Sequence, residues 1–212
     1  MHPQWLSNAF VVGEPGGPAV FVDSGAPLEP LLDAVERERL RPVAILRTHS
    51  HPDHVEHEEA LKERFGIEVV TGAFSQDGIE VQAIPCPGHS DDGVSFLLGE
   101  LLFSGDTLFR DSVGGGAAAV VRESVLRLLE LPPETRVLPG HTDETTIGRE
   151  AEENPFVRFW QGKEAEDGST CRVSGSDGVV LVRSPDYDGK GKLLVRLDDG
   201  AELIVGASRV EL

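Results

Sequence analysis

The sequence predicts an α/β fold of layered sheets and helices, followed by a small β-rich appendage. Over the first 160 residues, strand-like runs rich in β-branched residues alternate with segments of helical periodicity. The run at residues 43–46 is apolar at every position, which is typical of a central strand covered on both faces. After Trp160 the helical period disappears and only β-type runs follow. These observations indicate one layered core and a distinct C-terminal part.

The first part of the chain is predicted to contain a hairpin, a helix and a buried strand. Two β-type runs at 9–12 and 19–23 flank a turn-rich segment, as in a hairpin. In residues 27–40, leucines and a valine recur at helical spacing among acids and arginines, which indicates an amphipathic helix. The buried run at 43–46 then leads directly into a histidine-rich loop.

In the middle of the chain, predicted strands and helices continue to alternate. A glycine-rich loop at 114–116 precedes one amphipathic segment, and Phe156, Phe159 and Trp160 have the spacing of a terminal helix docked on the core. The elements predicted here are helices over 55–65 and 120–131 and strands over 67–71, 79–84, 94–98, 101–104 and 136–138.

The C-terminal segment is predicted to form a small barrel. Its β-type runs lie at 179–183, 192–197 and 202–205, and Asp198-Asp199-Gly200 suits a hairpin turn because glycine accepts a positive φ. We predict a main domain at residues 1–162 and a β-rich, SH3-like barrel at 168–212. This barrel could have any of three roles: it could mediate homodimerisation, cover a binding pocket as a lid, or dock a partner protein. The local sequence does not predict where the side chain of Tyr187 points.

Size and charge narrow the classes of function. The 212 residues suit one sizeable core plus an appendage. Aspartate and glutamate number 37 against 19 lysines and arginines, so the formal net charge is −18. This negative field repels nucleic acid and anionic membrane surfaces, and no run reaches the roughly 20 apolar residues of a membrane span. We therefore expect a small-molecule substrate and neither a nucleic-acid nor a membrane partner.

The N-terminus and the cysteines bear on the compartment. Residues 1–10 lack a basic start followed by an apolar block, so no signal peptide is predicted. Cys86 and Cys171 are far apart in the sequence and make no disulfide framework. We expect a cytoplasmic protein, with Cys86 as a small buried hydrophobe.

Five of the seven histidines lie in loops beside predicted strands. His49, His51 and His54 share one short loop with Asp53, and alternate residues of an extended backbone project to the same side. Imidazole and carboxylate ligands suit zinc, manganese or iron(II), and no cysteine pair lies nearby for a structural zinc site. The loop therefore predicts an open, catalytic metal site.

Three further ligand-type residues directly follow glycines at predicted strand ends. A glycine there lets the backbone crowd close to a site. Two metals roughly 3.5–4 Å apart need about six protein ligands and a shared carboxylate. The predicted ligands are His49, His51, Asp53, His54, His89, Asp106 and His141. His2 and His57 are instead predicted to be ordinary surface residues.

These residues stand in the order H-x-H-x-D-H, G-H, G-D and G-H, which resembles the metallo-β-lactamase superfamily and its glyoxalase II-like hydrolase branch. The resemblance covers about residues 6–160 and implies an αββα sandwich with two metals at one edge between the sheets. It implies one metal on His49, His51 and His89. It implies a second metal on Asp53, His54 and His141, with Asp106 bridging the two. Zinc is the expected metal, and iron or manganese are the alternatives.

The resemblance also implies a reaction. A hydroxide that bridges the two metals attacks the substrate, and Asp53 helps to orient it. A thioester suits this chemistry because a thiol of pKa about 8.5 departs as thiolate without a strong general acid. We therefore predict a di-metal hydrolase of a thioester or a related small acyl substrate.

Two departures from the branch leave the substrate open. Residues 114–117 read Gly-Gly-Gly-Ala where this branch has a Gly-Arg-x-Asp segment, and the C-terminal part is β-rich and acidic, not helical and basic. One alternative is a persulfide dioxygenase-like enzyme with a single iron on His49, His89 and Asp106. A lactonase of the same superfamily and a binding protein with a vestigial site are the others.

Overall fold

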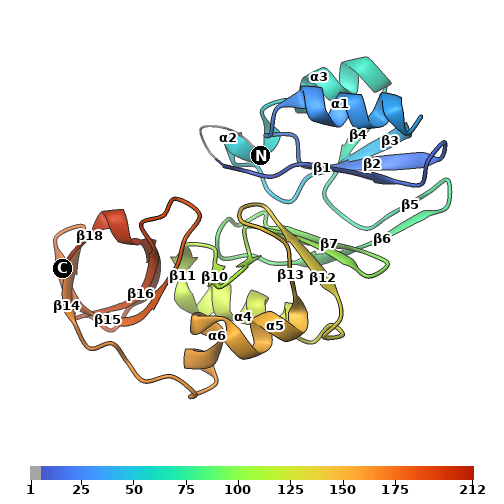
Figure 1. Cartoon of the computed structure of the whole chain (residues 1–212). Helices are drawn as coiled ribbons and strands as arrows, with labels where there is room; N and C mark the ends of the chain where they lie inside the picture. The colour runs from blue at the N-terminus through green and yellow to red at the C-terminus, as the bar shows by residue number, and fades with distance from the viewer. Residues whose placement is uncertain (1–5) are drawn as a thin grey trace.

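The computed structural model describes residues 6–212 as two facing sheets with helices on both outer sides, joined to a third sheet (Figure 1). The first sheet has the strand order β1-β2-β3-β4 and carries α1 and α3 on its outer face. Its elements are β1 (Phe10–Gly13), β2 (Pro18–Val22), α1 (Leu28–Arg37), β3 (Arg41–Leu46), α2 (Pro52–Val55), α3 (Glu58–Phe65) and β4 (Glu68–Val70).

The second sheet has the order β13-β12-β8-β7-β6-β5, and α4, α5 and α6 lie on its outer side (Figure 1). A two-stranded ribbon of β9 (Leu108–Phe109) and β10 (Ser112–Val113) lies after β8. The strands are β5 (Phe74–Gln76), β6 (Ile79–Pro85), β7 (Val94–Leu98), β8 (Leu101–Gly105), β12 (Arg136–Pro139) and β13 (Thr145–Thr146). The helices are α4 (Ala118–Leu128), α5 (Ile147–Glu153) and α6 (Pro155–Trp160).

Successive side chains of the central strands point to opposite faces of each sheet, and this alternation produces the layers of the fold. In β2, Val20 and Val22 face the space between the sheets and meet Phe96 and Phe103 of the second sheet, whereas Phe21 packs under α1. All five of these side chains are buried, with 1% or less of their surface exposed. Because alternate residues of a strand face opposite sides, one strand fills both the core between the sheets and the core under the helices, as in an αββα sandwich.

The C-terminal part is a curved sheet that also includes one short strand from the main domain. Its order is β11-β17-β16-β15-β14-β18, with β11 (Gly116–Ala117) coming from the glycine-rich loop. The remaining elements are β14 (Thr170–Val173), β15 (Ser176–Ser184), β16 (Lys192–Leu197), β17 (Glu202–Gly206), the 3₁₀ turn η1 (Ala207–Arg209) and β18 (Val210–Glu211). Because β11 and β18 stand at its two edges, strand pairing leaves the predicted barrel open.

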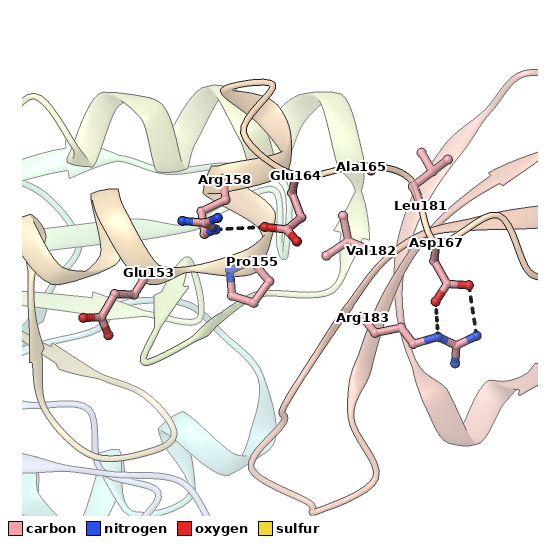
Figure 2. A pocket seen from close by; sticks show the side chains of 9 residues that line it. All are labelled: Glu153, Pro155, Arg158, Glu164, Ala165, Asp167, Leu181, Val182 and Arg183. Atoms are coloured by element: carbon pink, nitrogen blue, oxygen red, sulfur yellow. Dashed lines mark hydrogen bonds and ion pairs between the residues drawn. The ribbon is translucent and has the colours of Figure 1, made fainter.

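This C-terminal sheet shares a core with the main domain. Its residues Leu181, Leu194 and Ile204 are buried in the same hydrophobic cluster as Val121 and Val125 of α4. Residues 161–169 connect α6 to β14 and pass a cavity of about 380 Å³ that residues of α6 and β15 also line (Figure 2).

Ion pairs border this junction cavity. Arg158 pairs with Glu164 at 2.9 Å and Arg183 with Asp167 at 2.7 Å. Glu153, which also lines the cavity, pairs with Arg149 at 3.0 Å. We interpret the cavity as a structural junction because these charges are already neutralised by partners in the chain.

The predicted α/β class and αββα layers are confirmed. The helix predicted over 27–40 ends earlier, at Arg37, because the chain leaves the helix at Glu38 and Arg39 takes a left-handed φ of 54°. Residues 52–55, predicted within the histidine loop, form the short helix α2, with Pro52 at the start where its missing N–H costs nothing. Within residues 6–212, no helix is both long and apolar enough to cross a membrane.

Candidate metal centre

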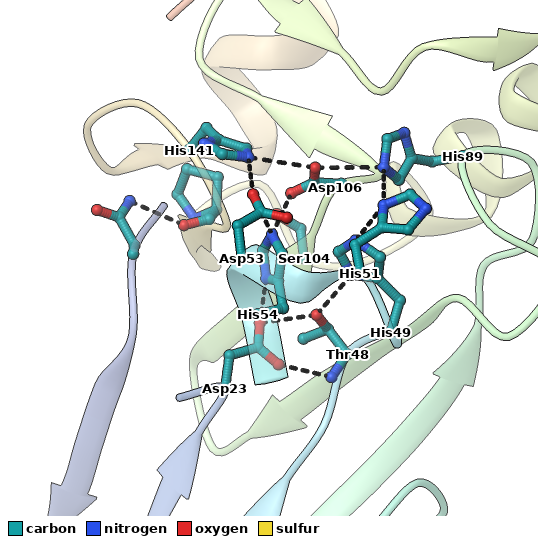
Figure 3. Close-up of polar contacts among 12 residues, drawn as sticks. Asp23, Thr48, His49, His51, Asp53, His54, His89, Ser104, Asp106 and His141 are labelled. Atoms are coloured by element: carbon teal, nitrogen blue, oxygen red, sulfur yellow. Dashed lines mark hydrogen bonds and ion pairs between the residues drawn. The ribbon is translucent and has the colours of Figure 1, made fainter. Parts of the chain in front are cut away.

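The seven predicted ligands meet at one end of the sandwich, although they come from four separate segments of the chain (Figure 3). His49 and His51 follow β3, while Asp53 and His54 lie on α2. His89 follows β6, Asp106 follows β8 and His141 follows β12. Since β3, β8 and β12 all end at this edge of the two facing sheets, the loops after them deliver their side chains to one place.

Three imidazoles form the first group. Nδ1 of His51 lies 3.1 Å from Nε2 of His49 and 3.0 Å from Nε2 of His89. Zinc–nitrogen bonds of about 2.0–2.1 Å put neighbouring nitrogens on one ion roughly 3.3 Å apart, close to these separations. These three nitrogens therefore have the spacing of ligands on one cation.

The second group contains a carboxylate and two imidazoles. Oδ2 of Asp53 lies 3.4 Å from Nε2 of His141 and 3.6 Å from Nε2 of His54. The side chains of His54 and His141 are almost completely buried, whereas that of Asp53 is 23% exposed. This group accordingly offers one solvent-accessible and two enclosed ligand atoms.

Asp106 joins the two groups. Its Oδ2 lies 3.4 Å from Nε2 of His89 in the first group and 3.3 Å from Nε2 of His141 in the second. Its Oδ1 lies 3.4 Å from Nε2 of His54. A carboxylate that reaches both groups is what a pair of cations with one shared ligand requires.

Hydrogen bonds fix which ring nitrogen faces the centre. The Nδ1 atoms of His89 and His141 lie 3.1 Å from the carbonyl oxygens of Gly115 and Leu6 respectively. A carbonyl only accepts, so each Nδ1 carries a proton, and in the neutral ring that binds a metal Nε2 presents its lone pair to the centre. Lone pairs aimed at one point are the arrangement that a cation satisfies.

Two buried atoms at the centre have no hydrogen-bond partner within residues 6–212. They are Nε2 of His54 and Oδ1 of Asp106. A buried polar atom without a partner costs roughly 1–3 kcal/mol, so such atoms call for an occupant. Both are good ligands for a divalent cation, and the residues present therefore fit the metals that the sequence implied.

The backbone leaves room at the same position. A Cβ atom at Gly140 would overlap Oδ1 of Asp106 and come within 2.7 Å of Cε1 of His54. The N–H of Gly140 also donates to the carbonyl of Gly105 at 2.9 Å, which brings the loops after β12 and β8 together. The glycine before His141 thus creates the space between the two ligand atoms that lack partners.

The two groups differ in their electrostatics. Burial lowers the pKa of His49 to about 4 and also lowers the pKa of His89, so these two members of the first group are neutral imidazoles. Burial also disfavours charge on His141, but its interactions with Asp106 and Asp53 outweigh burial and raise its pKa to about 10. The carboxylates around the second group therefore favour a positive charge beside them, which a metal cation can supply in place of the proton.

Asp23 and Thr48 support the ligands and were not predicted. Oδ2 of Asp23 accepts from Nδ1 of His54 at 2.8 Å and from the hydroxyl of Thr48 at 2.7 Å. The Thr48 oxygen lies 3.1 Å from Nδ1 of His49. The available signal was that Asp23 is the last residue of a predicted strand, close to where the ligands stand on theirs, but it belongs to no recognisable motif.

The other residues considered from sequence lie outside the centre. Cys86 is buried, and burial raises the pKa of its thiol, which fits the predicted role as a small hydrophobe. His57 precedes α3 as its N-terminal capping position and belongs to neither ligand group. His2 lies outside the described residues.

Comparison with known proteins gives a family model that matches most of the main domain. The model described as "Metallo-beta-lactamase superfamily" matches residues 2–73 and 58–141. A hydroxyacylglutathione hydrolase from Xanthomonas oryzae pv. oryzae is 36% identical over 145 residues. That match covers 59% of this chain and 56% of the relative, so the chain spans little more than half of that enzyme.

Two solved structures resemble the chain over most of their own length. The B3 metallo-β-lactamase BLEG-1 is 30% identical with a TM-score of 0.68, covering 71% of this chain and 94% of that chain. TTHA1623, solved in a di-iron-bound form, is 34% identical with a TM-score of 0.63, covering 74% of this chain and 97% of that one. More than a quarter of this chain thus lies outside each match.

Proposed function

From the premise that this chain belongs to the metallo-β-lactamase superfamily, we propose that it is a two-metal hydrolase which cleaves a thioester of a small acyl group. The observation that carries the proposal is Asp106, whose carboxylate contacts both ligand groups. A single metal on the first group would leave the second group of Asp53, His54 and His141 without a cation. The similarity to a hydroxyacylglutathione hydrolase over 145 residues supports the thioester class.

Each residue has a specific task in this proposal. When bound, the two cations supply a nucleophile from water at neutral pH and polarise the carbonyl of the substrate. His49, His51 and His89 would hold one cation, and Asp53, His54 and His141 would hold the other. Asp106, whose side chain is only 7% exposed, would hold both and keep their spacing.

Asp53 is the ligand best placed to handle a proton. Its side chain is 23% exposed, so its carboxylate is reachable by water and substrate, unlike that of Asp106. Its interaction with His141 helps to keep its pKa low despite partial burial, so it is ionised and accepts a hydrogen bond from the attacking water. We therefore assign Asp53 the role of orienting the water.

The leaving group favours a thioester over an amide. A thiolate of pKa about 8.5 leaves without a protonated donor, whereas an amine needs one. Lys192, the buried ammonium near the centre, lies 3.2 Å from Asp186 and donates to the carbonyl of Val113 at 2.9 Å, so its protons are already engaged. The chain therefore suits a substrate that departs as an anion.

Metal content and substrate class test the proposal together. The protein, loaded with zinc, manganese or iron(II), is assayed on a panel of thioesters and lactones, and oxygen uptake is followed with glutathione persulfide. We expect two metals per chain, zinc being our choice, and the highest kcat/KM on a thioester. Persulfide-dependent oxygen uptake with one iron per chain would instead establish the mono-iron alternative, and turnover of lactones alone would establish a lactonase.

The proposal also covers the cellular compartment and the oligomeric state of the protein. Cys86 and Cys171 are both free and buried, which agrees with the reducing cytoplasm that we propose as its location. A homodimer through residues 168–212 is our proposal for the assembly. Sedimentation analysis of the full chain should give the mass of two copies, and the mass of one copy would reject the dimer.

A further inference from the structure

A cavity of about 250 Å³ lies between the metal centre and the C-terminal sheet. On the side of the main domain it is lined by His89, Asp106 and Phe109. On the opposite side it is lined by residues of the β15–β16 loop and of η1, among them Tyr187 and Arg209. The open face of the centre is thus bounded by a part of the chain that lies beyond the family match, which ends at residue 141.

Tyr187 is an appendage residue in direct contact with the centre. Its ring stacks on the imidazole of His141, with centroids 3.9 Å apart and planes inclined by 9°. It meets the ring of Phe109 edge-on at 6.2 Å, and 38% of its surface is exposed. The ring therefore lies against a predicted ligand on one side and remains accessible from the cavity.

The loop that carries Tyr187 is fastened to the main domain. Asp186 and Lys192, at its two ends, form an ion pair of 3.2 Å with side chains only 6–7% exposed. The ammonium of Lys192 also donates to the carbonyl of Val113 and lies 4.8 Å from the ring centroid of Phe109. The N–H of Tyr187 donates to Oδ1 of Asp186 at 2.9 Å. These contacts hold the tyrosine ring in a defined position, so the wall has a fixed shape.

We propose that the C-terminal sheet forms one wall of the substrate pocket and that Tyr187 restricts the acyl group to a short chain. At roughly 30 Å³ for each water-sized group, the cavity holds on the order of eight non-hydrogen atoms. That volume accommodates a thioester carbonyl with a few carbon atoms, so a longer acyl chain would have to displace Tyr187 or leave the cavity. This inference rests on the proposed function, because it names the part of a thioester that occupies the cavity.

The same cavity volume bears on which end of the substrate lies against Tyr187. Thiol carriers such as a tripeptide or a nucleotide-linked thiol have far more than eight non-hydrogen atoms, so a whole carrier does not fit inside this cavity. The proposal therefore places the acyl group against Tyr187 and the carrier outside the cavity. The selectivity expected from this wall is one of acyl length, not of carrier identity.

The test compares acyl length preferences of variants of the metal-loaded full chain. Acetyl, butyryl, hexanoyl and octanoyl thioesters of N-acetylcysteamine are assayed with the wild type and with Tyr187→Ala and Tyr187→Phe. We expect Tyr187→Ala to raise kcat/KM for octanoyl relative to acetyl by at least roughly tenfold, because one methylene in a fixed pocket already changes selectivity by that factor. Tyr187→Phe keeps the ring and should retain the wild-type profile.

A control and a second measurement make the outcome decisive. Arg172→Ala changes β14 on the same appendage, where Arg172 pairs with Asp177, and should leave the profile and the metal content unchanged. Binding of acetate, butyrate and octanoate is measured by calorimetry on the same variants. Octanoate should bind Tyr187→Ala at least tenfold more tightly than it binds the wild type.

Failure of the proposed function and failure of this inference would give different results. If every variant lacks thioesterase activity, the proposed function fails, and the carboxylate series alone decides whether Tyr187 limits length. If thioesters are cleaved but Tyr187→Ala keeps the wild-type length profile in both measurements, the inference is overturned and the proposed function stands. A Tyr187→Phe variant that behaves like Tyr187→Ala would also overturn it, since the hydroxyl and not the bulk of the ring would then control selectivity.

Discussion

Asp23 and His54 form a buried pair in which Nδ1 of the imidazole lies 2.8 Å from Oδ2 of the carboxylate. The same carboxylate oxygen accepts from the Thr48 hydroxyl, whose oxygen lies 3.1 Å from Nδ1 of His49. One acid thereby orients a ligand of each group, His54 directly and His49 through Thr48, and belongs to neither group itself. Partners of this kind fix the tautomer and ring angle of a metal-binding histidine and raise its basicity.

Replacement of Asp23 by asparagine should weaken metal binding. The amide keeps the size of the side chain but removes the charge that holds the proton on Nδ1 of His54. We expect a 10- to 100-fold loss of metal affinity, which is typical of removing such a supporting partner. Competition with a chromogenic chelator measures it. Asp33→Asn, on the exposed face of α1, removes the same charge and should keep wild-type affinity; equal affinities in the two variants would contradict the role of Asp23.

The contrast between Asp23 and the predicted ligands shows what sequence reasoning can reach. His89, Asp106 and His141 each follow a glycine at a strand end, and the strand-like runs could be recognised from their apolar composition. Because strand ends gather at one edge of a sandwich, the order of ligand-type residues was enough to predict their convergence. Asp23 has the same position after a strand but no glycine and no neighbouring histidine, so nothing distinguished it from a surface acid.

The C-terminal part was predicted less completely, for a different reason. The strand β11 is only two residues long and pairs with β17, which lies far along the chain. Lys192 reads as a surface lysine, yet it is buried because Asp186 and the carbonyl of Val113 satisfy it. Both features depend on contacts between distant segments, which local composition does not encode. The domain boundaries at 162 and 168 stay predictions.

Loss of the His54 side chain should empty the second ligand group. His54→Ala removes one of its two enclosed ligand atoms, so we expect fewer than two metals per chain by elemental analysis. Activity on the preferred substrate should fall by more than the 10- to 100-fold that loss of a supporting partner causes. His57→Ala changes a nearby histidine outside both groups and should retain two metals. Full metal content and activity in His54→Ala would count against the two-metal assignment.

A single methyl group at residue 140 should be enough to disable the centre. Gly140→Ala places a Cβ against Oδ1 of Asp106 and Cε1 of His54, so one of these ligands must move. A displacement of about 1 Å at a reactive centre costs on the order of a hundredfold in rate, and we expect at least that loss of kcat/KM together with reduced metal content. Gly72→Ala is the matched control, because its Cβ meets no atom within 4 Å. If Gly140→Ala kept wild-type metal content and kcat/KM, the proposed packing around Asp106 would be wrong.

Removing one member of the buried Lys192–Asp186 pair should destabilise the protein more than removing both. Lys192→Met leaves the Asp186 carboxylate buried without its partner, and such losses cost about 3–5 kcal/mol. The double variant Lys192→Met with Asp186→Leu leaves no buried charge, so we expect it to recover most of that free energy of unfolding. Urea denaturation of the metal-loaded protein measures both.

The exposed pair of Arg183 and Asp167 provides the comparison for this buried pair. Their side chains are 40% and 26% exposed, so Arg183→Ala should cost less than about 1 kcal/mol. Because Lys192 also fastens the loop that carries Tyr187, the single variant should lose acyl-length selectivity along with stability, whereas Arg183→Ala should lose neither. Equal unfolding free energies for Lys192→Met and Arg183→Ala would show that the contacts of Lys192 do not hold the appendage against the main domain.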